Sequence, residues 1–117
     1  PIEYALEKGN DKIVVVLTRN PGYRKKRAVK ATEQLYKRAY KKYPNLVRTI
    51  MTRNAVYNKQ MKLIEKLEEE GKIFVIRPLI PTVSRMEKDY DKLQHFYMHG
   101  NRLMKKEYQG LLEYLNE

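Results

Sequence analysis

The stretch Lys12-Ile13-Val14-Val15-Val16-Leu17-Thr18 decides the fold of this chain. It holds five consecutive aliphatic residues, four of them β-branched, with neither polar alternation nor a helical period. Such a run, placed between a Gly-Asn-Asp turn and an Asn-Pro-Gly breaker, predicts a strand that is buried on both faces. A second run, Lys72-Ile73-Phe74-Val75-Ile76-Arg77, predicts another strand of the same kind.

The order of the predicted elements indicates how these strands pair. Two strands joined by a long helical crossover are typically parallel neighbours in one sheet. We therefore expect an α/β fold, a fragment of a parallel-sheet three-layer fold, with two buried parallel strands at about 12–18 and 72–77 and a helical C-terminus. Covering both faces of such a sheet requires more chain, so we expect this sequence to be a piece of a longer protein.

Apolar residues at helical spacing predict five helices. Pro44 separates the second from the third, because proline disfavours helical geometry in the residue before it. Gly9, Gly71 and Gly100 are expected near helix C-termini, and Asp89 or Asp91 at an N-cap. No internal repeat is present, so we expect one domain, residues 1–117. The predicted helices span about residues 2–8, 28–43, 45–70, 89–99 and 101–115.

Positive charge is concentrated in one part of the sequence. The chain has 25 Lys or Arg and 14 Asp or Glu, which gives a net charge of +11. Ten of the basic residues and a single acid, Glu33, fall between Tyr23 and Arg48. Such a segment attracts nucleic acid, anionic lipid head groups or acidic proteins. The alternative is a solvated helix face whose counter-charges lie elsewhere.

The loop after the first predicted strand begins this basic segment. Ligands of open α/β sheets usually bind at the carboxyl ends of the strands, where this loop lies. Contact between its cations and an anion or a lipid head group is therefore one interpretation, and a plain solvent loop is the one we favour. The candidate residues are Arg19, Arg24, Lys25, Lys26 and Arg27.

Tyrosines alternate with lysines in the helix predicted at 28–43. A stripe of this composition can stack on nucleic-acid bases or lie at a lipid interface. Core-facing tyrosines that keep their hydroxyl groups at the rim are the more common arrangement, and we expect that arrangement here.

Motifs for catalysis and metal binding are missing. Ser84 is the one serine and is not in a Gly-x-Ser-x-Gly elbow, so we expect it to be a turn or cap residue. His95 and His99 have the i, i+4 spacing of metal ligands, but further ligands are lacking, and cysteine is absent. We expect no catalytic residue, metal or cofactor, and a cytoplasmic location, with peripheral attachment to a membrane left open.

Several stretches occur in a recognisable order. They are Glu3–Arg19, Gly22–Lys26, Tyr40–Pro44, Arg53–Asn58, Leu63–Pro78, Val83–Asp89 and the helix containing Tyr97 and Gly100. This ordered set covers nearly the whole chain and resembles the later part of bacterial patatin-like phospholipases. The resemblance implies an α/β fold and a parent enzyme that hydrolyses lipid acyl esters with a serine–aspartate dyad.

The resemblance does not carry a catalytic residue to this chain. The family's serine lies in a Gly-x-Ser-x-Gly elbow and its aspartate in an Asp-Gly-Gly or Asp-Gly-Ala motif, and neither motif occurs here. Pro1-Ile2-Glu3-Tyr4-Ala5 resembles the Pro-x-x-x-Ala helix that follows the aspartate. Asp11 and Ser84 are therefore not assigned to the dyad. The resemblance implies a non-catalytic C-terminal portion whose partner is the upstream catalytic portion.

Three functional hypotheses remain open. In the first, the chain buttresses the sheet of a lipid hydrolase and its basic segment faces an anionic membrane. In the second, it is a small basic module that binds nucleic acid. In the third, it is a structural unit that self-associates when isolated, by strand pairing or through the helix seam between Val47 and Ile64.

Overall fold

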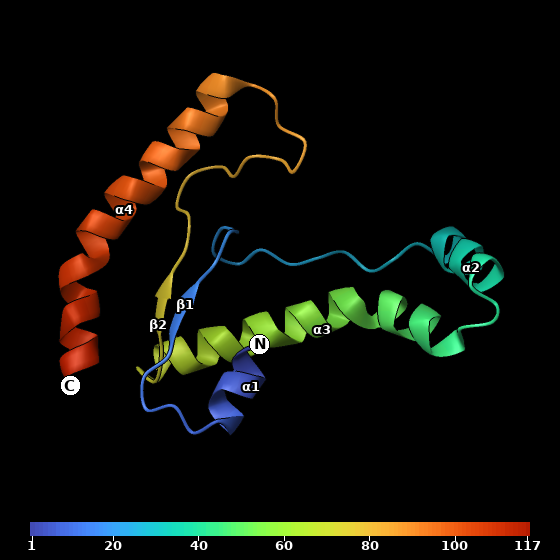
Figure 1. Cartoon of the computed structure of the whole chain (residues 1–117), viewed down its shortest axis with the longest axis horizontal. Coiled ribbons are helices and arrows are strands. Elements are labelled where there is room, and N and C mark those ends of the chain that lie inside the picture. The colour runs from blue at the N-terminus through green and yellow to red at the C-terminus, as the bar shows by residue number, and fades with distance from the viewer. The chain divides into compact units, whose positions relative to one another are not determined.

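The computed structural model describes all 117 residues and contains four helices and two strands (Figure 1). The strands pair in parallel, with Val14 opposite Phe74 and Val16 opposite Ile76. The predicted α/β class, with a parallel pair, a helical crossover and a helical C-terminus, is confirmed. In chain order the elements are α1 (Ile2–Glu7), β1 (Val14–Val16), α2 (Lys30–Ala39), α3 (Pro44–Glu69), β2 (Phe74–Ile76) and α4 (Tyr90–Asn116).

Internal contacts divide the chain into two units. The sheet unit comprises residues 1–23 and 66–117, and the helical unit comprises residues 24–65. Helix α3 begins in the helical unit and ends in the sheet unit. We describe each unit by itself.

The C-terminal half of the sheet unit holds one long helix where the sequence predicted two. Gly100 lies inside α4, so the helix end expected there was wrong. Glycine in a helix interior costs about 1 kcal/mol relative to alanine, and α4 offsets this by burying Leu103 and Tyr114. The N-cap expected at Asp89 is present, because its carboxylate accepts hydrogen bonds from two backbone N–H groups of the first turn, at 3.0 and 3.3 Å.

Other elements are shorter than predicted. The helix predicted at 28–43 spans only Lys30–Ala39, because Tyr40 leaves helical geometry (φ −113°, ψ 38°) a few residues before Pro44. The strands are three residues long each, and single hydrogen bonds extend the pairing, from Leu17 N–H to the Ile76 carbonyl (2.8 Å) and from Phe74 N–H to that of Ile13 (3.0 Å).

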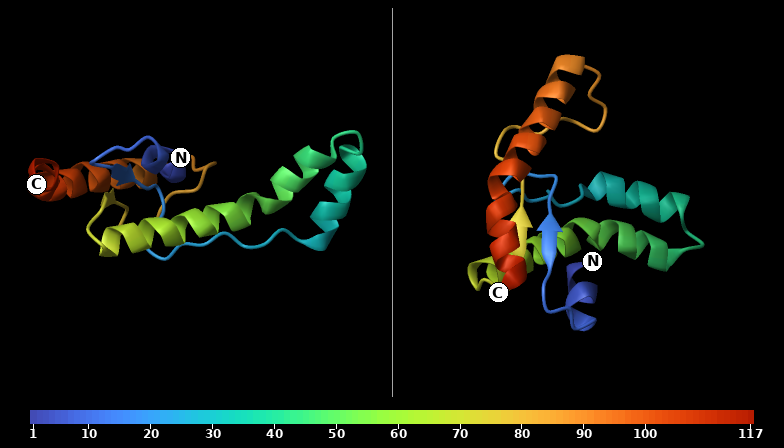
Figure 2. Two further views of the ribbon diagram at one scale, coloured as in Figure 1. Left: turned by 90° about the horizontal axis from the view of Figure 1, so that it is seen from below. Right: turned by 60° about the vertical axis from the view of Figure 1, so that its left-hand side comes forward.

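Helix α4 covers one face of the sheet unit mainly over β2 (Figure 2). The Phe74 and Tyr114 rings meet there, with centroids 5.8 Å apart. Parallel pairs place opposite residues on the same face, so Val14 and Val16 share this face with Phe74 and Ile76. The buried apolar side chains of the unit are Ile2, Leu67, Ile73, Ile76, Leu103 and Tyr114.

Strand β1 is not covered on that same face. Val14 is 39% exposed and Val16 is 68% exposed. The burial expected on both faces of this strand is therefore not met, because α4 packs against β2 and leaves the outer part of β1 open to solvent. The aliphatic composition of β1 exceeds what this chain alone buries.

The end of α3 shows how three consecutive acids are accommodated. Gly71, with φ of 69°, closes the helix, and Lys72 N–H bonds to the Leu67 carbonyl at 2.9 Å. Acids at a helix C-terminus oppose the macrodipole. Glu68 is paired with Arg77, and Glu70 lies 2.7 Å from the Lys72 ammonium. Local ion pairs therefore compensate two of these three acids, Glu68 and Glu70.

Side chains fasten the two strands together at both ends of the sheet. At the amino end, the Tyr114 hydroxyl accepts a hydrogen bond from Ile13 N–H (3.0 Å) and lies 3.0 Å from the Lys72 carbonyl, to which it donates. At the carboxyl end, the Asn20 amide donates to the carbonyls of Pro78 (3.2 Å) and Ile80 (2.7 Å). The residues that flank β1 are thus joined to those that flank β2.

We expect Tyr114→Phe to lower the free energy of unfolding by about 1–3 kcal/mol, because it leaves the Ile13 N–H and the Lys72 carbonyl without their partner. Urea unfolding measures the change as a lower midpoint at an unchanged slope. Tyr108→Phe, at an exposed position of the same helix, is the matched control and should change stability little. Equal midpoints for both variants would contradict this account.

Candidate functional site

The loop after β1 places the first candidate cation, Arg19. Asn20 to Tyr23 form a type II turn, with φ of 75° at Gly22 and a 3.2 Å hydrogen bond from Tyr23 N–H to the Asn20 carbonyl. Arg19 donates to the Thr82 hydroxyl at 3.3 Å, and its guanidinium lies 5.0 Å from the centre of the Tyr23 ring. The side chain is exposed, but these contacts hold it against its own unit.

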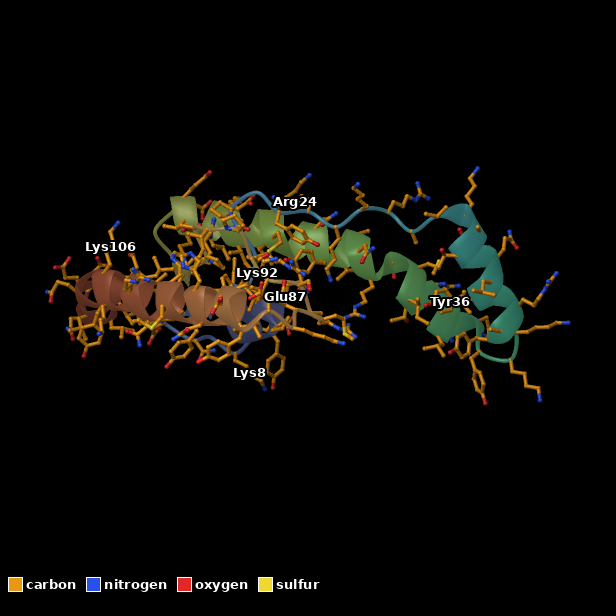
Figure 3. All side chains as sticks on the ribbon, turned by 90° about the horizontal axis from the view of Figure 1, so that it is seen from above. Lys8, Arg24, Tyr36, Glu87, Lys92 and Lys106 are labelled. Carbon is orange, nitrogen blue, oxygen red and sulfur yellow. The ribbon has the colours of Figure 1, made fainter.

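Arg24 is engaged in an ion pair within the helical unit. Its guanidinium lies 2.6 Å from the Glu65 carboxylate of α3. Figure 3 labels Arg24. The hydrogen bond donated to Glu65 raises the pKa of Arg24 above its ordinary value. Of the five candidates, Arg24 therefore has the plainest structural role, which is to fasten the start of this unit to α3.

Two asparagines of α3 hold the extended segment that follows Arg24. Asn58 accepts from Lys25 N–H at 2.8 Å and donates to the Lys25 carbonyl at 2.9 Å. One turn earlier, Asn54 donates to the Lys26 carbonyl at 2.7 Å. Their i, i+4 spacing puts both amides on one helix face, where they replace the partners that a neighbouring strand would supply. Asn54, which lies between Val47 and Ile64 in the sequence, thus binds backbone within its own unit.

The remaining candidates differ in how far they are available to a ligand. The Lys25 ammonium lies 4.4 Å from the centre of the Tyr57 ring, a cation–π contact. Lys26 and Arg27 are exposed. Arg19 belongs to the sheet unit and the other four cations to the helical unit, so the structure does not gather the five into one described site.

The net charge lies entirely in the helical unit. Residues 24–65 contain thirteen Lys or Arg and two acids, Glu33 and Glu65, which gives +11. The sheet unit contains twelve residues of each sign and is neutral. Both acids of the helical unit are paired, Glu65 with Arg24 (2.6 Å) and Glu33 with Lys37 (2.7 Å). The hydrogen bond from Lys37 lowers the pKa of Glu33, so this carboxylate stays ionised and paired.

The sequence predicted the positive charge of α2 but not the exposure of its tyrosines. The sequence predicted that its tyrosines face a core, and this was wrong, because α2 has no buried residue. Tyr36 and Tyr40 stack on each other, with ring centroids 6.0 Å apart and planes inclined by 16° (Figure 3 labels Tyr36). The sequence analysis identified the lysines of α2 as part of the basic segment. It did not show that the apolar residues of the same helix stay exposed.

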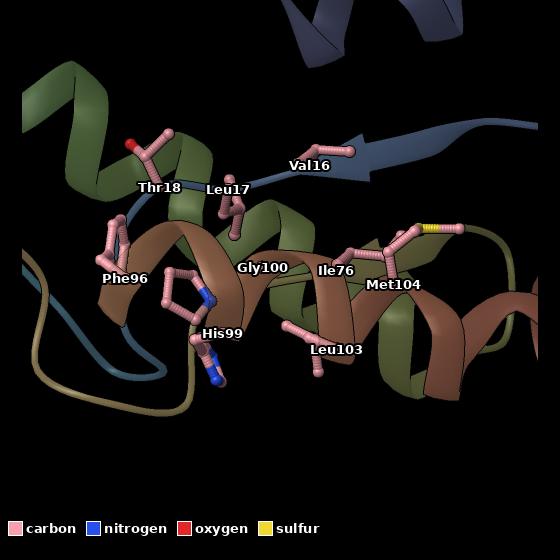
Figure 4. A pocket seen from close by; sticks show the side chains of 10 residues that line it. Val16, Leu17, Thr18, Ile76, Phe96, His99, Gly100, Leu103 and Met104 are labelled. Atoms are coloured by element: carbon pink, nitrogen blue, oxygen red, sulfur yellow. The ribbon is translucent and has the colours of Figure 1, made fainter. Parts of the chain in front are cut away.

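An apolar hollow of about 320 Å³ forms in the sheet unit between α4 and the carboxyl ends of the two strands (Figure 4). Val16 and Ile76 face Leu103 and Met104 across it. His99 at one end uses its Nε2 to accept a hydrogen bond from Leu79 N–H at 3.1 Å. This bond gives His99 a structural role in holding the connector after β2. The other residues that line the hollow are apolar or glycine, apart from Thr18.

Ser84 and His95 are not brought into a common site with these residues. The Ser84 carbonyl accepts a hydrogen bond from Glu87 N–H at 3.2 Å, which makes it the turn residue that the sequence predicted. His95 is exposed on α4.

Residues 43–116 match a family described as a domain of unknown function (DUF6363). The chain belongs to this family. The matched region runs from the start of α3 through β2 to the end of α4. No curated protein and no solved structure matches the chain. None of its helices combines the length and the apolar character that crossing a bilayer requires.

We expect Asn58→Ala to release the extended segment at Lys25, because the backbone N–H and carbonyl of that residue lose their partners. A loss of about 1–2 kcal/mol in local stability follows from the net value of such hydrogen bonds. Limited trypsin digestion should show faster cleavage after Lys25 and Lys26, and amide exchange at Lys25 should accelerate. Asn101→Ala, at an exposed position of α4, is the control; the same cleavage rate in both variants would exclude the role given to Asn58.

Proposed function

We propose that the chain is the non-catalytic C-terminal part of a patatin-like phospholipase whose parent hydrolyses lipid acyl esters. In this proposal the chain supplies two parallel strands and a helical layer that buttress the sheet, and its partner is the upstream catalytic portion. The ordered resemblance of its segments to that family supports the assignment, and the chain's lack of both dyad motifs makes this part non-catalytic.

The exposed face of β1 is the observation that carries the proposal. Strand β1 consists of three valines, and one of them, Val16, is 68% exposed. Val16 also lines an apolar hollow beside α4. A sheet of two short strands also leaves hydrogen-bonding groups unpaired at its edges. A further strand would pair with the edge groups, and a further helix would cover the exposed face of β1. In this proposal the catalytic portion, built on the same sheet, provides both elements.

The positive charge supports a second part of the proposal, a surface that faces an anionic membrane. The helical unit carries all of the net charge, while the unit that would join the sheet is neutral. Each suitably placed Lys or Arg contributes about 1 kcal/mol to attraction by an anionic leaflet.

The coding sequence upstream of Pro1 tests the hydrolase assignment directly. A Gly-x-Ser-x-Gly elbow followed by an Asp-Gly dipeptide shortly before Pro1 is expected. An upstream sequence without either motif would exclude the assignment, whatever the charged surface binds.

Val16→Lys tests the buttressing role. In the isolated chain the change should cost less than about 0.5 kcal/mol, since the side chain is largely in water. In the longer protein the same lysine would be buried without a partner, and we expect a loss of roughly 3–5 kcal/mol. Thermal unfolding and ester hydrolysis of the longer protein, beside urea unfolding of the isolated chain, measure the difference. Equal costs in both would contradict the proposed packing.

The same open face favours self-association of the isolated chain as a second property. Val47 and Ile64, which bound the predicted helix seam, are buried, so strand pairing through β1 is the favoured route. We expect sedimentation velocity to show oligomers at high concentration and Val16→Lys to suppress them, because lysine on an edge strand blocks pairing. Val29→Lys, at an exposed valine of the helical unit, should leave association unchanged. A monomeric wild-type chain would exclude this property.

A further inference from the structure

Helix α2 has two features that are unusual together in a helix that contacts only water. The first is charge: Lys30, Lys37, Arg38, Lys41 and Lys42 lie on or directly after it and are exposed. The only acid of the helix, Glu33, is occupied by Lys37 at 2.7 Å. The cations that remain therefore have no carboxylate of α2 to pair with, and they leave the helix strongly positive.

The second feature is an apolar stripe that α2 and its flanking residues leave in solvent. Leu35 is 66% exposed, Val29 is 69% exposed and Tyr43 is 61% exposed. Within the helix, Leu35 and Ala39 lie one turn apart, Lys30 and Lys37 lie on the opposite side, and Arg38 lies beside the stripe. An amphipathic helix whose apolar side is not packed in a core is typical of proteins that lie at a membrane surface.

The ring contacts favour a bilayer over a nucleic acid as the occupant. Tyr36 and Tyr40 stack on each other, and the Tyr57 ring is covered by the Lys25 ammonium at 4.4 Å. A base-stacking surface needs free aromatic faces, and each of these three rings has one face in contact with a neighbour, which reduces the area open to a base and leaves Tyr43 as the most exposed ring beside α2. Leu35 and Val29 offer aliphatic surface, which phosphates and sugars do not bind but acyl chains do.

We propose that α2 is an interfacial helix that inserts Leu35 into an anionic lipid bilayer, with its lysines and arginine at the head groups. This proposed lipid contact is made by α2 and not by the loop after β1. In that loop, Arg19 and Arg24 are held by neighbours within their own units. The inference rests on the membrane-facing part of the proposed function, and it does not depend on the hydrolase part.

A single tryptophan reports on insertion, because the chain has none of its own. We expect the emission of a Leu35→Trp chain to shift to the blue with phosphatidylcholine–phosphatidylglycerol vesicles and not with pure phosphatidylcholine vesicles. Leu115→Trp, at an exposed position of α4, is the matched control and should show no shift. Equal shifts at both positions would overturn the assignment to α2.

A second pair of variants removes apolar surface without changing charge. Leu35→Gln should weaken binding to the anionic vesicles about tenfold or more, the ratio expected when a leucine side chain no longer leaves water. Leu115→Gln should bind as the wild type does. Glutamine is a good helix former, and circular dichroism confirms that α2 is retained.

The remaining outcomes separate the alternatives. Equal vesicle binding by both glutamine variants would overturn insertion and leave a head-group contact alone. Absence of wild-type binding to anionic vesicles would overturn the inference together with the membrane part of the proposed function. A Leu35→Trp shift with a random single-stranded oligonucleotide and none with vesicles would overturn the inference in favour of nucleic acid. The hydrolase assignment is decided separately, by the upstream coding sequence.

Discussion

The hydroxyl group of Tyr114 is the contact on which the sheet unit depends. It lies 101 residues from Ile13 in sequence, yet it bonds to that residue's N–H and to the Lys72 carbonyl. These two backbone groups precede the two strands, so one side chain sets their relative position at the amino end of the sheet. Because the tyrosine is buried and its ring packs on Phe74, the same contact also fixes α4 against β2.

This arrangement holds the strands of the sheet unit in register but leaves one face of β1 exposed. Asn20 at the carboxyl end and Tyr114 at the amino end hold the strands in register, while Val16 and the hollow beside it stay open. A neutral unit with an exposed aliphatic face suits packing against more of the same fold. The helical unit is held differently, by the amides of Asn54 and Asn58 and by one ion pair, and it carries the charge. The open aliphatic face and the net charge thus lie in separate units of one chain.

Much of the fold followed from local patterns. The aliphatic runs around Val15 and Val75 predicted two strands, and their separation by helical sequence predicted parallel pairing, which the structure has. Gly22 and Asp89 occupy the turn and the cap that their residue types predicted. These features depend on neighbours in sequence, so a pattern of a few residues determines them. The candidate cations were likewise visible as charge, but charge alone did not separate those that are held by neighbours from those that are exposed.

Only the tertiary structure decided which side chains are covered. It continued α4 through Gly100, because burial of Leu103 and Tyr114 outweighs the weak preference of one glycine. It engaged Arg24 with Glu65, left Leu35 in solvent and placed Val16 at an open face, and none of these follows from residue type. The sequence by itself determined the two strands, their parallel pairing and the amount of charge. Their coverage depends on contacts between residues far apart in the chain, and no local pattern encodes those.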